Sequence, residues 1–303
     1  MSSTEPSPGP DRRATLLVLA GELRPELHRY CARLMASVID GEDAVQDTLE
    51  RALVALPDLA PATPLRPWLF RIAHNRALDL LRGRAVRGAV PIESAPDLAD
   101  PSSPDPMETL MRQQAVATAV SRFAELPLPQ RSVVILKDVL DESLSEIAAL
   151  LDLTVDAVKS HLARGRARLR EIDAEPAPPA RPRAPSAAVA RYVALFNRRD
   201  WDGLRSLLAD DVKLRQSERP LRVGRADVGM FFTFYARPDW EVWLAPAWLE
   251  GREVIAVFHD RADPKPGYFM WLEWRDGRIS FIHDYRYIRY VAADAEISLA
   301  SIS

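Results

Sequence analysis

The sequence predicts a multidomain protein in which two all-α modules are followed by an α+β domain. Proline-rich stretches at 89–106 and 172–186 divide the 303 residues into three pieces. The first two pieces repeat apolar residues every three to four positions, which is typical of amphipathic helices. The third alternates apolar and polar residues, which is typical of strands. The expected segments are a leader at 1–11, modules at 12–88 and 107–171, a domain at 187–293 and a tail at 294–303.

Composition limits the classes of protein that fit. Hydrophobic residues make up 48% and charged residues 27% of the chain, which is ordinary for folded domains. No apolar run is long enough to cross a bilayer, and the first residues lack the apolar segment of a signal peptide. The chain has one cysteine, Cys31, and no Cys/His cluster of zinc spacing. We therefore expect a cytoplasmic protein with no disulfide, metal, cofactor or membrane partner.

Charge is distributed unevenly along the first module. Five acids and no lysine or arginine lie between residues 40 and 50, whereas six arginines and a single acid, Asp79, lie between residues 66 and 87. If these are neighbouring helices, the acidic one could bind a basic protein partner and the basic one could bind phosphate groups. Solvated helix faces that partly neutralise each other explain the same pattern equally well.

The arginine-rich stretch also carries aromatic side chains. Residues 67–84 contain Trp68 and Phe70 together with arginines, a histidine and an asparagine. Stacking surfaces, hydrogen-bonding groups and cations in this combination bind separated DNA strands. We expect most of the large apolar side chains to be core, which leaves as candidate DNA-binding residues Arg71, His74, Asn75, Arg76, Arg82 and Arg84.

The second module contains a predicted helix–turn–helix. Ser143–Leu151 is the first helix, residues 152–154 are the turn, and Val155–Arg170 is the second helix with Thr154 as its N-cap. Acids precede the second helix, whereas Lys159–Arg170 holds five lysines and arginines, a histidine and no acid. A basic second helix suits the major groove of DNA, and an ordinary helical hairpin is the alternative.

The third piece is expected to pack helices on a mostly antiparallel sheet. Six of the seven tryptophans lie in it. Gly251 and the pair Asp276-Gly277 separate alternating runs and are expected to form hairpin turns. The expected helices are at 187–197 and 201–208, and the alternating runs are at 241–249, 253–259, 268–274 and 278–290.

We expect this third domain to be a regulatory module and not an enzyme. A general base must be a titratable group beside apolar walls, and the candidates are Asp211, His259, His283 and Asp284. His283 and Asp284 are adjacent in an expected strand, so their side chains should point to opposite faces. Seventeen acids balance seventeen bases over 187–303, which argues against a nucleic-acid surface.

Three motifs in order resemble bacterial extracytoplasmic-function sigma factors. They are Gly41-Glu-Asp-Ala-Val-Gln-Asp-Thr-Leu, then Trp68-Leu-Phe-Arg-Ile-Ala-His-Asn-Arg-Ala-Leu-Asp, then the late helix–turn–helix. The resemblance covers 12–171 and implies a region 2 bundle followed by a region 4 module. As partners it implies promoter DNA and core RNA polymerase, bound through the β′ clamp helices and the β flap. The implied activity is transcription initiation from minus-ten and minus-thirty-five promoter elements.

The resemblance also assigns roles to residues. The motif that docks on the β′ clamp helices is matched by Glu42, Asp43, Gln46 and Asp47. The stretch near the melted minus-ten element is matched by Arg71, His74, Asn75 and Arg76, and 57–66 matches the loop that holds a flipped-out base. The residues expected at the minus-thirty-five element are Thr154, Lys159, Ser160, His161, Arg164, Arg166 and Arg168. Asp152, Ala157 and His161 depart from the residues frequent in the family, which leaves the promoter sequence open.

The third domain resembles the SnoaL-like fold, a cone-shaped domain of polyketide cyclases and isomerases that also extends some of these sigma factors. The resemblance rests on 207–214 and 223–228. We expect this domain to regulate the sigma modules in cis by packing against them, because a short hinge keeps its local concentration high. A stand-alone helix–turn–helix regulator and a SnoaL-like enzyme with a DNA-binding head are the alternatives.

Overall fold

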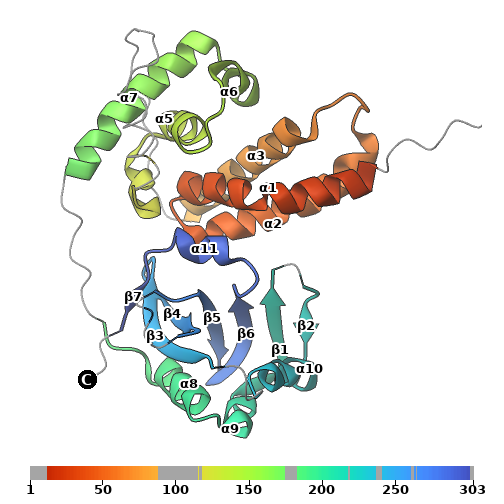
Figure 1. The fold of residues 1–303 in the computed structure, drawn as a ribbon, viewed down its shortest axis with the longest axis vertical. Helices are drawn as coiled ribbons and strands as arrows, with labels where there is room; N and C mark the ends of the chain where they lie inside the picture. The colour runs from red at the N-terminus through yellow and green to blue at the C-terminus, as the bar shows by residue number, and fades with distance from the viewer. Residues whose placement is uncertain are drawn as a thin grey trace, which may run out of the picture. The chain divides into compact units, whose positions relative to one another are not determined.

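The computed structural model describes residues 12–87, 115, 118–174, 183–217, 219–236, 241–260, 263 and 265–300. The chain divides into two compact units, Met1–Pro176 and Ala177–Ser303 (Figure 1). The described part of the first unit is helical, and the second unit combines helices with one sheet, as the sequence predicts. The expected leader at 1–11, the expected linker at 89–106 and residues 175–182 of the second linker lie outside the described residues.

Three long helices form the bundle that the sequence predicts for the first module. They are α1 (Arg12–Met35), α2 (Val38–Ala55) and α3 (Leu65–Arg87), with the short turn η1 (Leu56–Asp58) after α2. Ser37 caps α2, and its hydroxyl accepts a hydrogen bond from the backbone N–H of Asp40 at 3.1 Å. Helices α1 and α2 approach closely at Gly41, where an added Cβ would lie 2.5 Å from the Cα of Ala32. A side chain at position 41 would therefore push the two helices apart.

The second module contains the predicted helix–turn–helix. The turns and helices are η2 (Val120–Glu125), α5 (Leu128–Val134), the π-helical turn η3 (Ile135–Val139), α6 (Leu144–Leu151) and α7 (Val155–Ala174). Ser143 begins α6 with a capping box that includes Glu146. The hydroxyl of Thr154 accepts from the backbone N–H of Ala157 at 3.1 Å, so the predicted N-cap of α7 is confirmed. Between the two helices, Asp152 adopts a left-handed φ of 57°, a conformation that aspartate tolerates better than most residues.

One hydrophobic core runs through both helical modules. It joins Leu27, Tyr30 and Phe70 of the first bundle to Phe123 and Leu136 of the second. The two pieces that the sequence predicts as separate modules thus bury side chains against each other. Burial of this kind removes apolar surface from water and holds the modules together.

The second unit is built on a seven-stranded sheet in the order β2-β1-β6-β5-β4-β3-β7. All its strand pairs are antiparallel except β1 with β6, which is parallel. Both predicted hairpins form, because Glu250-Gly251 and Asp276-Gly277 have the positive φ angles that two-residue turns require. The strands are β1 (Leu208–Gln216), β2 (Arg222–Val223), β3 (Trp243–Leu249), β4 (Arg252–Phe258), β5 (Tyr268–Arg275), β6 (Arg278–Asp284) and β7 (Ser298–Leu299).

Short helices pack on this sheet and bury an aromatic core. Helix α8 packs on β3, and α10 packs on β1. The buried aromatic side chains include Tyr192, Phe196, Phe231, Phe232 and Tyr268. The helices and turns are α8 (Ala187–Asn197), α9 (Trp201–Ser206), α10 (Arg225–Gly229), η4 (Met230–Phe234) and α11 (Arg289–Ala293).

Three strands, β1, β2 and β7, lie where the sequence predicts none. Strand β1 replaces the last residue of the helix expected at 201–208 and continues to Gln216, with Val212, Leu214 and Gln216 facing inward. Strand β7 lies in the expected tail and pairs with β3. The tail therefore adds an edge to the sheet, although its sequence is too short and mixed to reveal a strand.

The close approach at Gly41 predicts a loss of stability in the Gly41→Ala variant. Overpacking a tight helix crossing typically costs about 1–3 kcal/mol. Urea unfolding followed by far-UV circular dichroism, which the helical unit dominates, measures the change. Gly21→Ala in α1 is the matched control, because an added Cβ there meets nothing within 4 Å. The control should gain about 0.5–1 kcal/mol from helix propensity. Equal effects at both positions would contradict the crossing geometry.

Candidate promoter and polymerase interface

Of the four candidate docking residues on the acidic helix α2, one is exposed. Asp43 is exposed, whereas Glu42 is 3% exposed and forms a buried ion pair with Arg24 of α1. Arg24 also donates to Oε1 of Gln46 at 3.0 Å, and the Gln46 amide donates to Glu50 at 2.9 Å. The buried pair therefore fixes the side of α2 from which Asp43 projects.

The acids of α2 and the arginines of α3 partly neutralise each other. Arg76 donates from Nε to Oδ2 of Asp47 at 2.7 Å, with a second contact from Nη2. Arg84, also on α3, forms an ion pair with Asp40 of α2. For these residues the structure agrees with the second explanation of the charge pattern, in which opposite faces of neighbouring helices pair.

The remaining candidates on α3 differ in exposure. Asn75 and Arg82 are exposed, and Arg71 is exposed but donates from Nη2 to the carbonyl oxygen of Ala149 at 3.0 Å. His74 is half-buried, with Nδ1 2.7 Å from the Tyr30 hydroxyl. Burial, aided by the charge of Arg82, lowers the pKa of His74 to about 4. His74 is therefore neutral at physiological pH and offers a ring nitrogen, not a charge, to any ligand.

The loop between α2 and α3 is tied to the start of α1. Arg12 donates to the carbonyl oxygens of Leu59 at 2.9 Å, Ala60 at 3.1 Å and Thr63 at 3.4 Å. Three backbone acceptors in the loop are thus satisfied by one guanidinium. The segment 57–66, which the family resemblance assigns to a flipped-out base, is held by α1 as well as by its own flanking helices.

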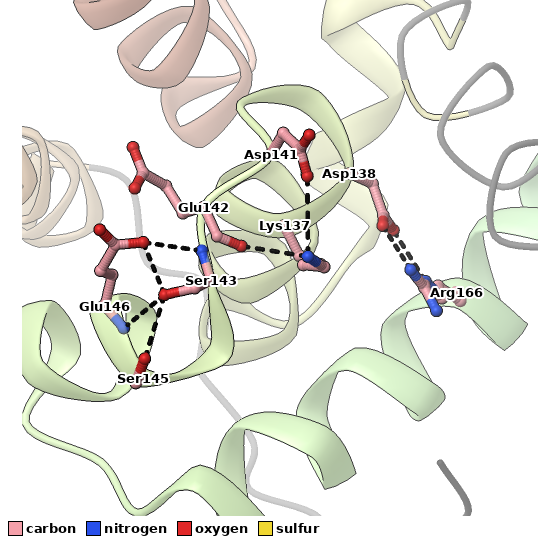
Figure 2. Close-up of polar contacts among 8 residues, drawn as sticks. All are labelled: Lys137, Asp138, Asp141, Glu142, Ser143, Ser145, Glu146 and Arg166. Atoms are coloured by element: carbon pink, nitrogen blue, oxygen red, sulfur yellow. Dashed lines mark hydrogen bonds and ion pairs between the residues drawn. The ribbon is translucent and has the colours of Figure 1, made fainter. Parts of the chain in front are cut away.

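The candidates on α7 divide into residues that face solvent and residues that hold the helix in place. Thr154 and Arg168 are exposed, and Lys159, His161 and Arg164 are half-buried. Ser160 is 8% exposed, so burial in the helical core keeps its hydroxyl from facing DNA in this arrangement. Arg166 donates to the fully buried Asp138 through two bonds, of 2.9 and 2.6 Å (Figure 2). Its guanidinium therefore anchors α7 to η3, a role that the sequence analysis did not anticipate.

Polar contacts also connect η3 to the start of α6 (Figure 2). Lys137 donates to the carbonyl oxygen of Glu142 at 3.2 Å and lies 3.7 Å from a carboxylate oxygen of Asp141. The backbone N–H of Ser143 donates to Glu146 at 2.9 Å, and hydrogen bonds from Ser143 lower the pKa of that carboxyl. The turn before the helix–turn–helix is thus fixed at both ends.

Three arginines link the second helical module to the first. Arg131 is buried and donates to the carbonyl oxygen of Leu34 in α1 at 2.8 Å. Its other bonds, at 2.9 Å, go to carbonyls of Ala124 and Leu126 in its own module. Burial lowers the pKa of Arg131 to about 10, so the guanidinium stays charged at neutral pH.

The other two linking arginines belong to α3. Arg66 forms ion pairs with Glu26 of α1 and with Glu142, which precedes α6. Arg71 reaches the backbone of α6 at Ala149. As a result, the first helix of the helix–turn–helix packs on α3, the helix that carries the minus-ten candidates.

The four candidate catalytic groups of the second unit each have a different partner. Asp284 is 2% exposed and accepts from the Gln216 amide at 2.6 Å, and burial raises its pKa to about 6. His283 points to the other face of β6, as predicted, and stacks on Trp271 with ring centroids 4.2 Å apart. Asp211 pairs with Arg275, and the ring of His259 lies 5.7 Å from that of Tyr268.

The described residues contain neither a membrane-spanning helix nor a metal-binding cluster. None of the helices there is both long and apolar enough to span a membrane. Within the same residues, no group of three or more His, Cys, Asp or Glu side chains is arranged to hold a metal ion.

Comparison with known proteins assigns the helical unit to a family. Residues 19–87 match the family model for Sigma-70 region 2, and residues 119–169 match that for Sigma-70 region 4. The RNA polymerase sigma factor CnrH of Cupriavidus metallidurans is 37% identical over 140 residues, which are 44% of this chain and 73% of CnrH. The ECF RNA polymerase sigma factor SigM of Mycobacterium tuberculosis is 30% identical over 148 residues, or 48% of this chain and 71% of SigM. The chain belongs to the extracytoplasmic-function sigma factors.

A third relative and a third family match extend beyond the two sigma regions. The ECF RNA polymerase sigma factor SigG of Mycobacterium tuberculosis is 33% identical over 222 residues, which are 65% of this chain. The chain spans about 60% of the length of SigG. Residues 189–282 match the SnoaL-like domain. This sigma factor therefore carries region 2, region 4 and a C-terminal SnoaL-like domain, and the expected fold class is confirmed.

The anchoring pair and the expected DNA contact on α7 predict different effects for neighbouring substitutions. Asp138→Ala leaves the anchoring charge of Arg166 without its buried partner and should destabilise region 4 by about 3–5 kcal/mol. Arg168→Gln, at an exposed position, should leave stability unchanged and weaken binding to duplex DNA that carries the minus-thirty-five element. Hydrogen exchange of α7 peptides and fluorescence anisotropy of labelled DNA measure the two effects. Equal loss of stability in both variants would contradict this division.

Proposed function

We propose that this protein is a sigma factor that binds core RNA polymerase, recognises minus-ten and minus-thirty-five promoter elements and initiates DNA-templated transcription in the cytoplasm. The observation that carries the proposal is that one chain contains both sigma regions, with region 4 forming a capped, basic helix–turn–helix. We assign 12–88 to region 2, 107–171 to region 4 and 187–293 to the SnoaL-like domain, with β7 as an addition from the tail.

Helix α2 is the proposed docking element for the β′ clamp helices. Asp43 is exposed on it and supplies a negative charge for direct contact. Glu42, Gln46 and Asp47 belong to the same surface but are held by Arg24 and Arg76, so we assign them mainly to shaping it. Region 4 would contact the β flap, as the family resemblance implies.

The proposed minus-ten surface lies on α3 and comprises Arg71, His74, Asn75, Arg76, Arg82 and Arg84. Of these, Arg76 and Arg84 must exchange their acidic partners for DNA phosphates. Arg71 must leave the Ala149 carbonyl of α6. Because the two promoter elements lie several helical turns apart on DNA, we propose that region 4 separates from region 2 when the promoter is bound.

The proposed minus-thirty-five surface lies on α7. Thr154 at the N-cap and Arg168 are exposed, and the half-buried residues Lys159, His161 and Arg164 complete the surface. The N-terminal part of a second helix contacts base edges in helix–turn–helix proteins, whereas basic side chains contact phosphates and fix the register. Ser160 and Arg166 support this helix from within.

We propose that the SnoaL-like domain regulates the sigma regions in cis and is not an enzyme. Its fusion to region 4 through the Pro-rich segment 172–186 keeps it at high local concentration. Two of the four candidate bases are paired away from the buried Asp284, Asp211 with Arg275 and His283 with Glu273, which argues against a site that uses all four. Removal of 187–303 should change promoter output.

The docking proposal predicts that Asp43→Arg abolishes binding to core polymerase and run-off transcription, because it reverses the exposed charge of α2. Glu22→Arg, at an exposed acid of α1, is the matched control and should retain both activities. Native gel shifts of core polymerase and run-off assays on a library of promoters give the two readouts. A fully active Asp43→Arg protein, or no specific start sites from the unmodified chain, would refute the proposed function.

A further inference from the structure

The SnoaL-like domain contains a cavity of about 470 Å³. It is bounded by the connection between β1 and β2, by η4 and by the segment after β6. A volume of this size is typical of sites for small organic molecules. Of the described residues around the cavity, three are arginines, Arg219, Arg222 and Arg286, and one, Asp227, is an acid. The described lining therefore carries an excess of positive charge.

Each of the three guanidinium groups lies over an aromatic ring. Arg219 is 4.7 Å from the ring centre of Tyr287, and Arg222 is 5.8 Å from that of Phe234. Arg286 is 5.4 Å from the ring centre of Tyr235. For Arg219 and Arg222, contact with a ring face restrains the guanidinium and leaves its N–H donors, which lie in the guanidinium plane, able to bind a carboxylate.

The inner end of the cavity is fixed by buried polar contacts. Gln216 is 7% exposed, lines the cavity and donates to Oδ2 of Asp284 at 2.6 Å. The backbone N–H of Arg286 donates to the other carboxyl oxygen of Asp284 at 3.2 Å. The same buried side chain thus sets the positions of Gln216 and of the Arg286 backbone. A site that is fixed before the ligand arrives loses less conformational entropy on binding.

Apolar side chains complete the wall. Phe231 is buried, Phe234 is 41% exposed and Leu221 is 48% exposed, and all three line the cavity. An inorganic anion would leave these surfaces unused, whereas an organic anion with a flat body covers them. The combination therefore favours a ligand with one charged end and an apolar, planar remainder.

We propose that this cavity binds a small planar organic anion of the aromatic carboxylate class. Its carboxylate would lie at the guanidinium groups of Arg219 and Arg222, and its ring against Phe231 and Phe234. The inference concerns the SnoaL-like domain itself and does not depend on the proposed binding of polymerase. If the domain regulates the sigma regions, aromatic carboxylates are the class of small molecule to which it would respond.

Calorimetric titration of the full chain with benzoate tests the proposal. Benzoate should bind at one site, and benzamide, which has the same shape without the charge, should bind at least about tenfold more weakly. The Arg219→Gln/Arg222→Gln variant should lose at least about tenfold in benzoate affinity. Arg191→Gln, at an exposed arginine on α8, is the matched control and should bind as the unmodified chain does.

A second pair of variants avoids the stacked arginines. Leu221→Glu places a carboxylate at the cavity and should repel benzoate, whereas Val223→Glu, exposed on β2 and outside the lining, should not. Equal binding of benzoate and benzamide, unchanged affinity in the arginine and Leu221 variants, or binding of inorganic phosphate in place of benzoate would each overturn the proposal. So would the absence of any benzoate binding.

Discussion

A buried arginine joins the two sigma regions of this protein. Arg131 of region 4 donates to the Leu34 carbonyl of α1 and to two carbonyls of its own module, while the hydrophobic core continues from α1 into α5 and η3. Hydrogen bonds from a charged donor typically contribute about 1.5–3 kcal/mol each, and an unmade bond would leave a buried charge unsatisfied. The position of α6 on α3 depends on this junction.

Several arginines of α3 have partners within the chain, some of them across this junction. Arg71 is bonded to α6, Arg76 to Asp47, and Arg66 to Glu26 and Glu142. Guanidinium groups that suit phosphate also suit carboxylates and carbonyls, so the free protein satisfies them internally. In the proposed function, binding of DNA would exchange one set of charged contacts for another. The free-energy difference between the two arrangements is smaller than the strength of either set.

Local sequence signals predicted many of the helices and strands, but they could not predict contacts between residues that are distant in the sequence. Apolar periodicity predicted helices in both modules and located the helix–turn–helix, and the turn residues Gly251 and Gly277 located both hairpins. The buried pair of Arg166 with Asp138 joins residues 28 positions apart, and no local pattern separates an anchoring arginine from one that faces DNA. The acid Asp138, which stands among apolar residues a few positions before the helix–turn–helix, is a sequence signal that could have suggested the pair. The packing of region 4 on region 2 had no such signal.

Regions 2 and 4 pack together in the free chain, and we propose that they separate when the promoter is bound. Double electron–electron resonance measures this directly with spin labels at Glu22→Cys on α1 and Ala174→Cys at the end of α7, both exposed positions outside the candidate interfaces, since the native Cys31 is buried. The account predicts one short, narrow distance distribution in the free protein and a longer distance with core polymerase and promoter DNA. The same distribution in both states would contradict it.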